Sequence, residues 1–381
     1  MGSGAVMLGF VFSFFLAPLS AEFGWSRSAI SMALFLIPAS ALVMPVVGAL
    51  IDKHGGFRVV VPSILMLSAG YVLVTFVSGA IWTFYAALAL TLVLGIASGP
   101  IAYSRAVAGA FSKARGMALA LALSGSSISA ILLPPAVEWL ISNEGWRAGF
   151  LFLAAVATIF GLPAAWIGLR GRSVEQPSET KSAPISIVQH LRSRHLPLLM
   201  GAVFFTGLPV FGLVSQLRAL LDDRGFSTGE AVFTVSLVGG AVLVGRIATG
   251  LLIDRIWAPG VAAAIVLLAM IGAVLLTQSD AVFWLTATGV FLIAMAQGAE
   301  LDLIAFLTAR YFGMEAFGRL YSFVYLAFAI SLPVGATLFA ASFDIVGSYS
   351  LALYMSAAGF ALAAALFLAL GQYPVAQKAE T

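Results

Sequence analysis

Hydrophobic positions along the chain form long apolar segments, and short polar segments separate them. About 20 mostly apolar residues suffice for a helix to cross a bilayer. We predict twelve such spans, and the chain would therefore cross the membrane twelve times. They cover residues 4–20, 28–50, 59–79, 81–107, 117–141, 148–169, 197–221, 229–252, 258–278, 281–307, 318–342 and 350–370. The pattern predicts an all-α integral membrane protein.

The polar segment near residues 170–196 is much longer than the others and separates six spans from six. It predicts an N-terminal six-helix bundle over 1–170, a cytoplasmic linker over 171–196, a C-terminal six-helix bundle over 197–371 and a cytoplasmic tail over 372–381. The first span is short and no basic residue precedes it. We therefore expect the first span to be truncated and the natural start to lie upstream of Met1.

Composition excludes several classes of protein. The chain is 61% hydrophobic and 9% charged, whereas soluble domains are about 45–50% apolar and about 25% charged. An ordinary soluble enzyme, a disordered protein and a nucleic-acid-binding protein are therefore not expected. The chain has no Cys and only three His, which are too few and too far apart for a zinc-binding pair on a helix. We therefore expect neither a metal site nor a cofactor. No Lys follows a Gly, which excludes a phosphate-binding P-loop.

Basic residues are distributed unequally between the loops on the two sides of the predicted membrane. With residue 1 in the cytoplasm, the inner loops and tails hold 13 Lys and Arg. The outer loops then hold three, which are Arg27, Arg147 and Arg224. Cytoplasmic loops carry the excess of basic residues in membrane proteins. We therefore predict that both termini are cytoplasmic and that the protein lies in the inner (plasma) membrane.

The two halves of the sequence repeat one another. GALIDK (48–53) and GLLIDR (250–255) are 202 positions apart, as are GWRAGF (145–150) and GSYSLA (347–352). In the outer loops, GWS (24–26) and GFS (225–227) are 201 apart. The spacing predicts a duplication of six spans, that is, two pseudo-symmetric six-helix bundles in the same orientation.

The repeated segments carry a resemblance to a known family. GALIDKHGGFR (48–58) resembles the loop 2–3 signature of the major facilitator superfamily, and GLLIDR resembles its counterpart in the second half. The resemblance implies a twelve-helix transporter fold in which this loop helps to lock closed states by charge contacts. The implied gating residues are Gly48, Asp52, Lys53, Arg58, Gly250, Asp254 and Arg255.

A finer resemblance runs through most of the chain. EFGWSRSAIS (22–31), ARGMALALALSG (114–125), GWRAGF and VGRIATGLLIDR (244–255) are similar to bacterial members of the monocarboxylate porter and oxalate/formate antiporter group. In that group an Arg in span eight, four residues before a Gly, binds the substrate carboxylate. Arg246 and Gly250 match this pattern, whereas Val242 stands where proton-linked porters often carry Asp. The family also implies a monomer.

Charged residues inside spans are costly and mark functional candidates. Arg246, Arg105 and Asp302 lie about 12 Å from the cytoplasmic turns at 1.5 Å per residue, and Glu300 lies a little deeper. A guanidinium can hold a carboxylate through two parallel hydrogen bonds. We expect Arg246 and Arg105 to bind substrate, together with Tyr103 and Gln216. Asp302 and Glu300, 200° apart on a helix, are the candidates to carry a coupling proton.

Structural roles remain open for each of these residues. Arg246 would serve equally in a salt bridge between bundles, and Arg105 would snorkel to the interface. Either carboxyl would serve as a structural partner of an arginine or an amide. At the outer end, Arg218 is expected to snorkel or to form a local ion pair, with Asp222 and Asp223 within reach, and the alternative is a role in attracting anions from the outer side. Glu138 is expected to reach water.

The sequence therefore predicts a secondary active transporter of a small organic anion, a monocarboxylate, working by alternating access with a proton as coupling ion. The alternative within the same fold is an efflux porter for drugs or metabolites. A polytopic membrane enzyme is the alternative from another class, but it should show clustered catalytic carboxylates or a His–Asp pair at one membrane face. We find neither pattern and expect no enzyme activity. The expected partners are the anion, the coupling ion and the lipid bilayer, with no nucleic acid.

Overall fold

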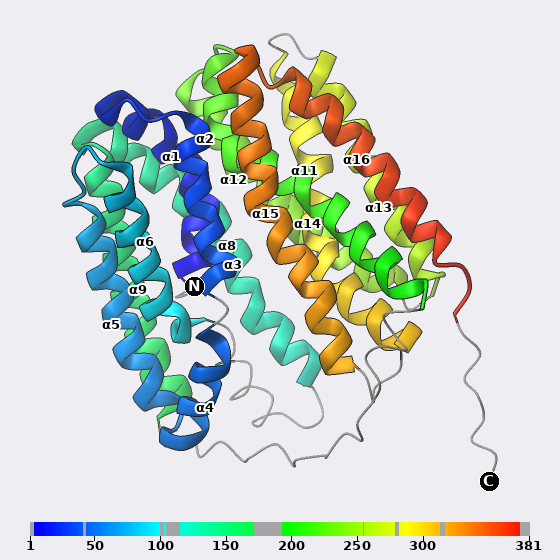
Figure 1. The fold of residues 1–381 in the computed structure, drawn as a ribbon, viewed down its shortest axis with the longest axis horizontal. Helices are drawn as coiled ribbons and strands as arrows, with labels where there is room; N and C mark the ends of the chain where they lie inside the picture. The colour runs from blue at the N-terminus through cyan, green and yellow to red at the C-terminus, as the bar shows by residue number, and fades with distance from the viewer. Residues whose placement is uncertain are drawn as a thin grey trace. The chain divides into compact units, whose positions relative to one another are not determined.

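A computed structural model of the protein describes residues 4–40, 43–99, 103, 115–170, 193–253, 255–278, 282–312 and 317–373. These residues form helices joined by short turns (Figure 1). In chain order the helices are α1 (Gly4–Phe23), α2 (Arg27–Met32), η1 (Ala33–Phe35), α3 (Leu36–Ser40), α4 (Met44–His54), α5 (Gly56–Val74), α6 (Ile81–Gly95), η3 (Ile96–Ser98), α8 (Arg115–Glu144), α9 (Trp146–Leu169), α11 (His195–Asp223), α12 (Thr228–Ile253), α13 (Ala258–Gln278), α14 (Phe283–Phe312), α15 (Phe317–Val346) and α16 (Ser350–Ala369).

Most of the predicted spans coincide with helices of the structure. Within the described residues, nine helical segments are long and apolar enough to cross a membrane, and Met7–Phe23 and Arg27–Ser40 are shorter apolar ones. The predicted all-α membrane fold is confirmed. The span expected over 28–50 is described as short pieces, α2, η1, α3 and α4. Pro38 in α3 lacks an amide donor, which favours the 3-10 turn at Ala33–Phe35. Pro45 stands in the first turn of α4, where a helix needs no amide donor.

Contacts within the chain divide it into two compact units. The first comprises residues 1–179, 213–240 and 336–348, and the second comprises 180–212, 241–335 and 349–381. In the first unit α5 packs against α6 and α9, and α1 packs against α8. In the second unit α13 packs against α14 and α16. The division of the sequence into two six-helix bundles stays a prediction.

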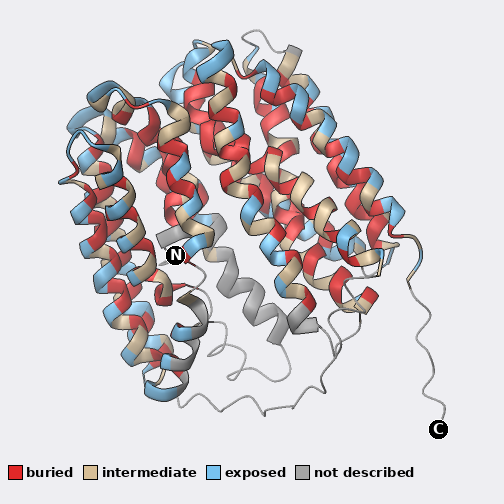
Figure 2. Ribbon diagram, in the orientation of Figure 1, coloured by how far each residue is buried: buried red, intermediate tan, exposed pale blue. Residues whose placement is uncertain are grey.

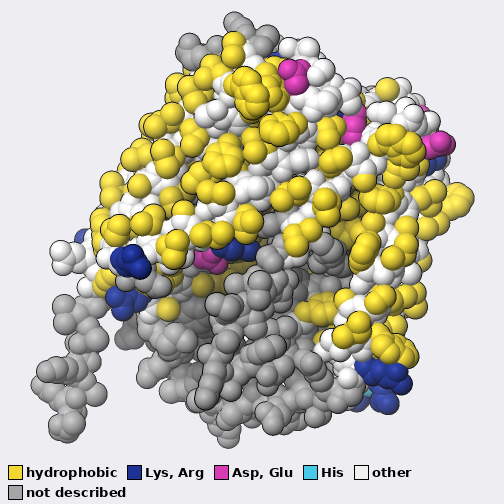
Figure 3. All heavy atoms as spheres, turned by 180° about the vertical axis from the view of Figure 1, so that it is seen from behind, with side chains coloured by type: hydrophobic (Ala, Val, Ile, Leu, Met, Phe, Trp, Pro, Cys, Tyr) yellow, Lys and Arg dark blue, Asp and Glu magenta, His cyan; other side chains and the backbone are white. Residues whose placement is uncertain are grey.

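Buried residues recur every three or four positions along the helices, as α5 illustrates (Figure 2). Its buried positions are Val60, Ser63, Ile64, Leu67, Gly70, Tyr71 and Val74, in addition to Gly56. Many large apolar side chains on the other helix faces are exposed, such as Ile167 at 79% and Trp284 at 70%. Figure 3 shows hydrophobic side chains covering most of the described helices on one face of the molecule. An apolar outer surface of this extent suits contact with lipid rather than water.

The turns of the two sequence halves share a backbone conformation. Gly24 and Gly225 have φ of 71° and 76°, and Gly145 and Gly347 have φ of 84° and 73°. This left-handed region suits glycine because it has no Cβ. Both pairs coincide with the repeat positions in the sequence, so the internal repeat is visible in the geometry of the turns.

Candidate functional site

The candidate site lies in the second unit, where α12 and α14 approach each other at their backbones. Gly245 faces the backbone of Met295, and Gly298 faces the backbone of Val242. A Cβ built on Gly298 would lie 2.8 Å from the carbonyl carbon of Val242 and 2.9 Å from the amide nitrogen of Arg246. No ordinary side chain fits at that distance, so glycine at both positions permits the close contact. This contact places Arg246 of α12 beside α14.

Arg246 and Asp302 form a loose ion pair across these two helices. The Nε of Arg246 lies 3.6 Å from Oδ2 of Asp302, and the side chains are 23% and 40% exposed. The distance exceeds that of a hydrogen bond. Among the described residues, the buried Nε has no hydrogen-bond partner. The guanidinium therefore keeps a donor available for another carboxylate, and Asp302 balances its charge meanwhile.

Glu300 has a different environment, although it lies only two residues from Asp302. It is 3% exposed and lies against α11 and α15. A Cβ on Gly207 of α11 would stand 3.2 Å from its Oε1 and would also clash with the Ser331 hydroxyl of α15. Within the described part of the chain, neither carboxyl oxygen of Glu300 has a hydrogen-bond partner. The two acidic side chains thus meet different neighbours, as their helical spacing predicts.

A row of aromatic rings lies on α15 next to this site. Tyr321 and Tyr325 stack with centroids 6.0 Å apart, and Phe328 follows 5.5 Å from Tyr325. Tyr321 also interacts electrostatically with Asp302. Tyr321 was not among the residues predicted from the sequence. Its position four residues before Tyr325, on the same helix face, is the signal that would have found it.

The other predicted substrate residues lie in the first unit or outside the described residues. Tyr103 packs against a buried apolar cluster that includes Ile51, Ile64 and Leu169. Gln216 is fully buried, and its Nε2 donates a hydrogen bond to Oγ of Ser31 at 2.8 Å. The prediction for Arg105 falls outside the described residues.

The predicted gating residues are described in part. Lys53, Arg58 and Arg255 are exposed, as befits a polar turn. A Cβ on Gly250 would meet no heavy atom of the described residues within 4 Å. Gly48 and Asp52 belong to α4, but their side chains lie outside the described part, as does the whole of Asp254. The gating role of this set stays a prediction.

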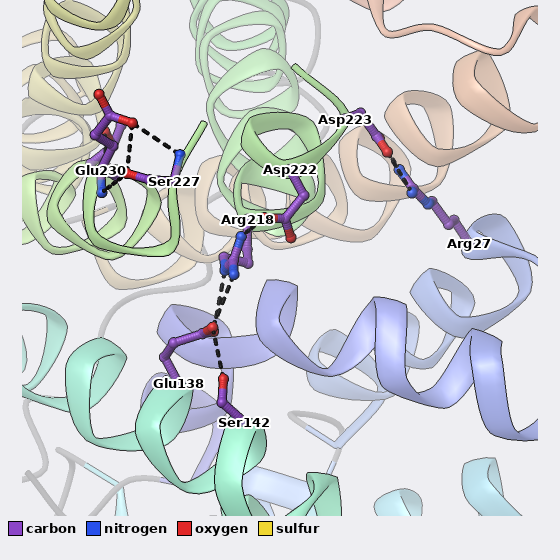
Figure 4. A network of polar contacts seen from close by, with 9 residues as sticks. Arg27, Glu138, Ser142, Arg218, Asp222, Asp223, Ser227 and Glu230 are labelled. Carbon is purple, nitrogen blue, oxygen red and sulfur yellow. Dashed lines mark hydrogen bonds and ion pairs between the residues drawn. The ribbon is translucent and has the colours of Figure 1, made fainter. Parts of the chain in front are cut away.

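A second group of charged side chains lies in the first unit, at the helix ends that the loop charges predict to be outer (Figure 4). We call Arg27, Glu138, Arg218, Asp222 and Asp223 the outer ionic network. Arg218 of α11 donates to both carboxyl oxygens of Glu138 of α8, at 2.9 and 3.2 Å. It also forms an ion pair with Asp222, as the sequence predicts. The expectation that Glu138 reaches water is wrong: it is 9% exposed, because an arginine 80 positions along the chain covers it.

Sequence comparison relates the chain to membrane transporters. The profile of the Major Facilitator Superfamily matches residues 1–336. Over 188 residues the chain is 30% identical to monocarboxylate transporter 13 of Bos taurus, a match that covers 48% of this chain and 38% of that protein. It is also 23% identical over 217 residues to an aspyridones efflux protein of Emericella nidulans, a match that covers 55% of this chain and 42% of that protein. The chain thus spans less than half the length of these curated relatives.

Solved structures extend the likeness to the whole fold. A bacterial homologue of the human lysosomal transporter Spinster, in an inward-facing and occupied conformation, matches with a TM-score of 0.68 at 14% identity. The match covers 98% of this chain and 95% of that one. An unoccupied form of the same homologue matches equally well, with a TM-score of 0.68.

Proposed function

The chain belongs to the major facilitator superfamily, and we propose that it is a secondary active transporter that moves a small organic anion, a monocarboxylate, by alternating access. The family and the fold make it a multi-pass membrane transporter rather than an enzyme. The nature of the substrate is the part that we propose, and the chemistry of α12 and α14 supports it.

The observation that carries the proposal is the loose pairing of Arg246 with Asp302 at 3.6 Å. Arginine stays charged at any working pH, and its planar group fits a carboxylate in two parallel hydrogen bonds. A half-buried guanidinium whose Nε has no hydrogen-bond partner among the described residues therefore supports a preformed site for an anion. The similarity to monocarboxylate transporter 13 supports the same substrate class.

Proton coupling follows from the same pair. A substrate carboxylate that takes Arg246 would leave Asp302 without its counter-ion in a membrane span. An unpaired charge in that setting is costly, so we propose that Asp302 takes up a proton when the substrate binds. Arg105, Tyr103 and Gln216 remain proposed substrate residues, and Glu300 remains the second proposed proton carrier. We further propose a monomer in the inner membrane with cytoplasmic termini.

Thermal stabilisation of the purified protein tests the anion proposal. A ligand that binds only the folded state adds about 2.7 kcal/mol of stability at 100 times its Kd. We expect one member of a panel of formate, acetate, propionate, lactate and oxalate to raise the unfolding temperature of the wild type. Arg246→Ala should weaken its affinity about 10- to 100-fold, because hydrogen bonds to charged groups contribute about 1.5–3 kcal/mol.

Two further variants make the result specific. Arg246→Lys keeps the charge but loses the planar fork, so we expect only partial stabilisation by the acid. Arg170→Ala removes an exposed arginine that stacks on Trp166, and its response to the acid should equal that of the wild type. The anion proposal is wrong if no acid stabilises the protein while apolar cations or neutral compounds do.

That contrary result would favour the second candidate, an efflux porter for drugs or metabolites. The similarity to the fungal aspyridones efflux protein supports this candidate, since that match covers more of this chain than the match to the bovine transporter. Export of an uncharged compound would need no contact with the guanidinium of Arg246. Arg246→Ala would then leave ligand stabilisation unchanged.

A further inference from the structure

The outer ionic network contains a second pair of an arginine and a carboxylate, which shares no residue with the Arg246–Asp302 pair. Arg218 holds Glu138 through two parallel hydrogen bonds, Nη2 to Oε1 at 2.9 Å and Nε to Oε2 at 3.2 Å. Both side chains are only 11% exposed. This fork-to-fork geometry is the one by which arginine recognises a free carboxylate. Glu138 thus occupies a position that another carboxylate could fill.

The surroundings of Arg218 fix its guanidinium independently of Glu138. Asp222, one turn later on α11, pairs with its Nη1. The ring of Phe14 lies 5.9 Å from its Cζ and forms an apolar wall. Ser142, one turn after Glu138 on α8, donates to Oε1 of Glu138 at 3.2 Å, so it holds Glu138 and does not contribute to the placement of Arg218. If Glu138 withdrew, Arg218 would therefore keep its orientation and present two unsatisfied donors.

The neighbouring contacts join segments from both halves of the sequence. Arg27, in the first half, donates to both oxygens of Asp223 at 2.5 and 3.1 Å, and its guanidinium lies 3.8 Å from the ring of Phe343. The amide of Ser28 donates to Asp344 at 3.0 Å. Alternating access requires such cross-half contacts to break when the outer side opens. Separation of α8 from α11 would then uncover Arg218.

We propose that Arg218 is an outer binding site for the carboxylate group of an incoming substrate, and that Glu138 occupies this site in the closed arrangement. The external carboxylate and Glu138 compete for the same two donors, Nε and Nη2. Substrate on the outer side therefore favours the opened arrangement by replacing Glu138. This inference rests on the proposed transport of a carboxylate and on the predicted orientation of the helices.

A single introduced cysteine provides the test, because the chain contains no Cys. Ser31 is fully buried beside Gln216 in the same region, so Ser31→Cys reports when the outer contacts open. The measurement is the rate of labelling by a membrane-impermeant maleimide in intact cells. We expect one acid of the stabilisation panel to raise the labelling rate at least threefold above the rate measured in chloride at equal ionic strength. Arg218→Gln should abolish this rise, and Glu138→Gln should give fast labelling without any acid.

Two variants separate carboxylate binding from a purely structural lock. Arg27→Ala breaks a cross-half ion pair of the same kind but leaves Arg218 in place, so the response to the acid should persist. The double variant Glu138→Arg/Arg218→Glu keeps an ion pair between α8 and α11, but it moves the guanidinium from α11 to α8. The proposal is overturned if this exchange restores the response to the acid, or if Arg218→Gln keeps it.

Failure of the outer site is distinguishable from failure of the proposed function. Arg246→Ala leaves the outer site intact, so the acid should still raise the labelling rate of the double variant Arg246→Ala/Ser31→Cys. If an acid stabilises the purified wild type through Arg246 but no acid changes labelling, the outer site is wrong and the transporter proposal stands. If no acid has either effect, both proposals are wrong.

Discussion

At the residue scale, two carboxyls on α14 lie in different environments, and the proposed proton coupling depends on that difference. Asp302 has a cation at 3.6 Å and a side chain that is 40% exposed, so substrate and water can reach it. Glu300 is 3% exposed, and its oxygens meet no donor among the described residues. A change of charge is therefore far easier at Asp302 than at Glu300. We expect Asp302 to be the carboxyl that exchanges a proton during each cycle.

Neutral isosteres at the two positions test this division. Asp302→Asn cannot take up a proton, so uptake driven by an inward pH gradient should fall at least tenfold. Binding of the acid by Arg246 should persist, because Asp302 competes with the acid for that guanidinium. Glu300→Gln should retain most of the pH-driven uptake, since a neutral side chain of equal size suits the buried position. The measurement is uptake of labelled acid into proteoliposomes at several external pH values.

The opposite outcome would assign the roles differently. Loss of pH-driven uptake in Glu300→Gln but not in Asp302→Asn would make Glu300 the proton carrier. Wild-type behaviour of both variants at every pH would end the proton-coupling proposal altogether.

At this scale, the depth of a residue along its helix could be predicted from the sequence. The contact partner of a residue could not be predicted where that partner is distant along the chain. The depths of Arg246 and Asp302 predicted a shared layer, and the structure pairs these two residues. The burial of Glu138 was not predictable, because its partner Arg218 lies on a helix from the other half. No local pattern says which of several arginines will cover a given carboxyl. Tyr321 could have been selected from its spacing to Tyr325, but its neighbour Asp302 could not be predicted from the sequence.

At the element scale, the position of the site depends on the close contact between α12 and α14. Gly245 and Gly298 each face backbone atoms of the other helix. Small residues let membrane helices approach closely and pack tightly. The pair of contacts fixes both the separation and the register of the helices, and the register sets Arg246 opposite Asp302.

Gly298→Ala tests this dependence. The added methyl would meet the Val242 carbonyl and the Arg246 amide at 2.9 Å or less, so the helices must separate. We expect a loss of about 1–3 kcal/mol in stability, as overpacking typically costs, together with weaker stabilisation by the acid. Gly240→Ala on α12 is the matched control, because its Cβ would meet nothing within 4 Å of the described residues. It should be neutral or stabilising by up to about 1 kcal/mol. The measurement is thermal unfolding of the wild type and the two variants in detergent, with and without acid. Equal unfolding temperatures of the two variants would contradict the prediction.

The length of the apolar segments predicted the position of most helices well, but it predicted the breaks within a span poorly. The predicted span 258–278 coincides with α13, and the prediction for 148–169 differs from α9 by two residues at its start. The segment predicted as one span over 28–50 is described as several short helices. A count of apolar residues takes no account of the missing amide donor of Pro38. The register between helices was also beyond the sequence, since it depends on which glycine meets which backbone.

At the scale of the whole molecule, the internal repeat explains both the similarity of the halves and one contact between them. Glu22 and Asp223 hold equivalent places before the Gly24 and Gly225 turns. Glu22 pairs with Arg147 of its own half, at 2.7 Å. Tyr349 stands at the position in the second half that corresponds to Arg147, so Asp223 has no equivalent partner there. Asp223 instead pairs with Arg27 of the first half. A departure from the repeat thus produces a contact between the repeats.

The direction of the chain across the membrane decides what these contacts do, and it has a direct test. The loop charges predict that the Lys53 turn is cytoplasmic and that the Asn143 turn, near Glu138, is outside. Both side chains are exposed, and the chain has no native Cys. In intact cells, we expect an impermeant maleimide to label Asn143→Cys at once and Lys53→Cys only after permeabilisation. The reverse pattern would put Arg218 on the cytoplasmic side. Its carboxylate site would then serve release or export rather than uptake, because a site acts on the substrate pool of the side to which it opens.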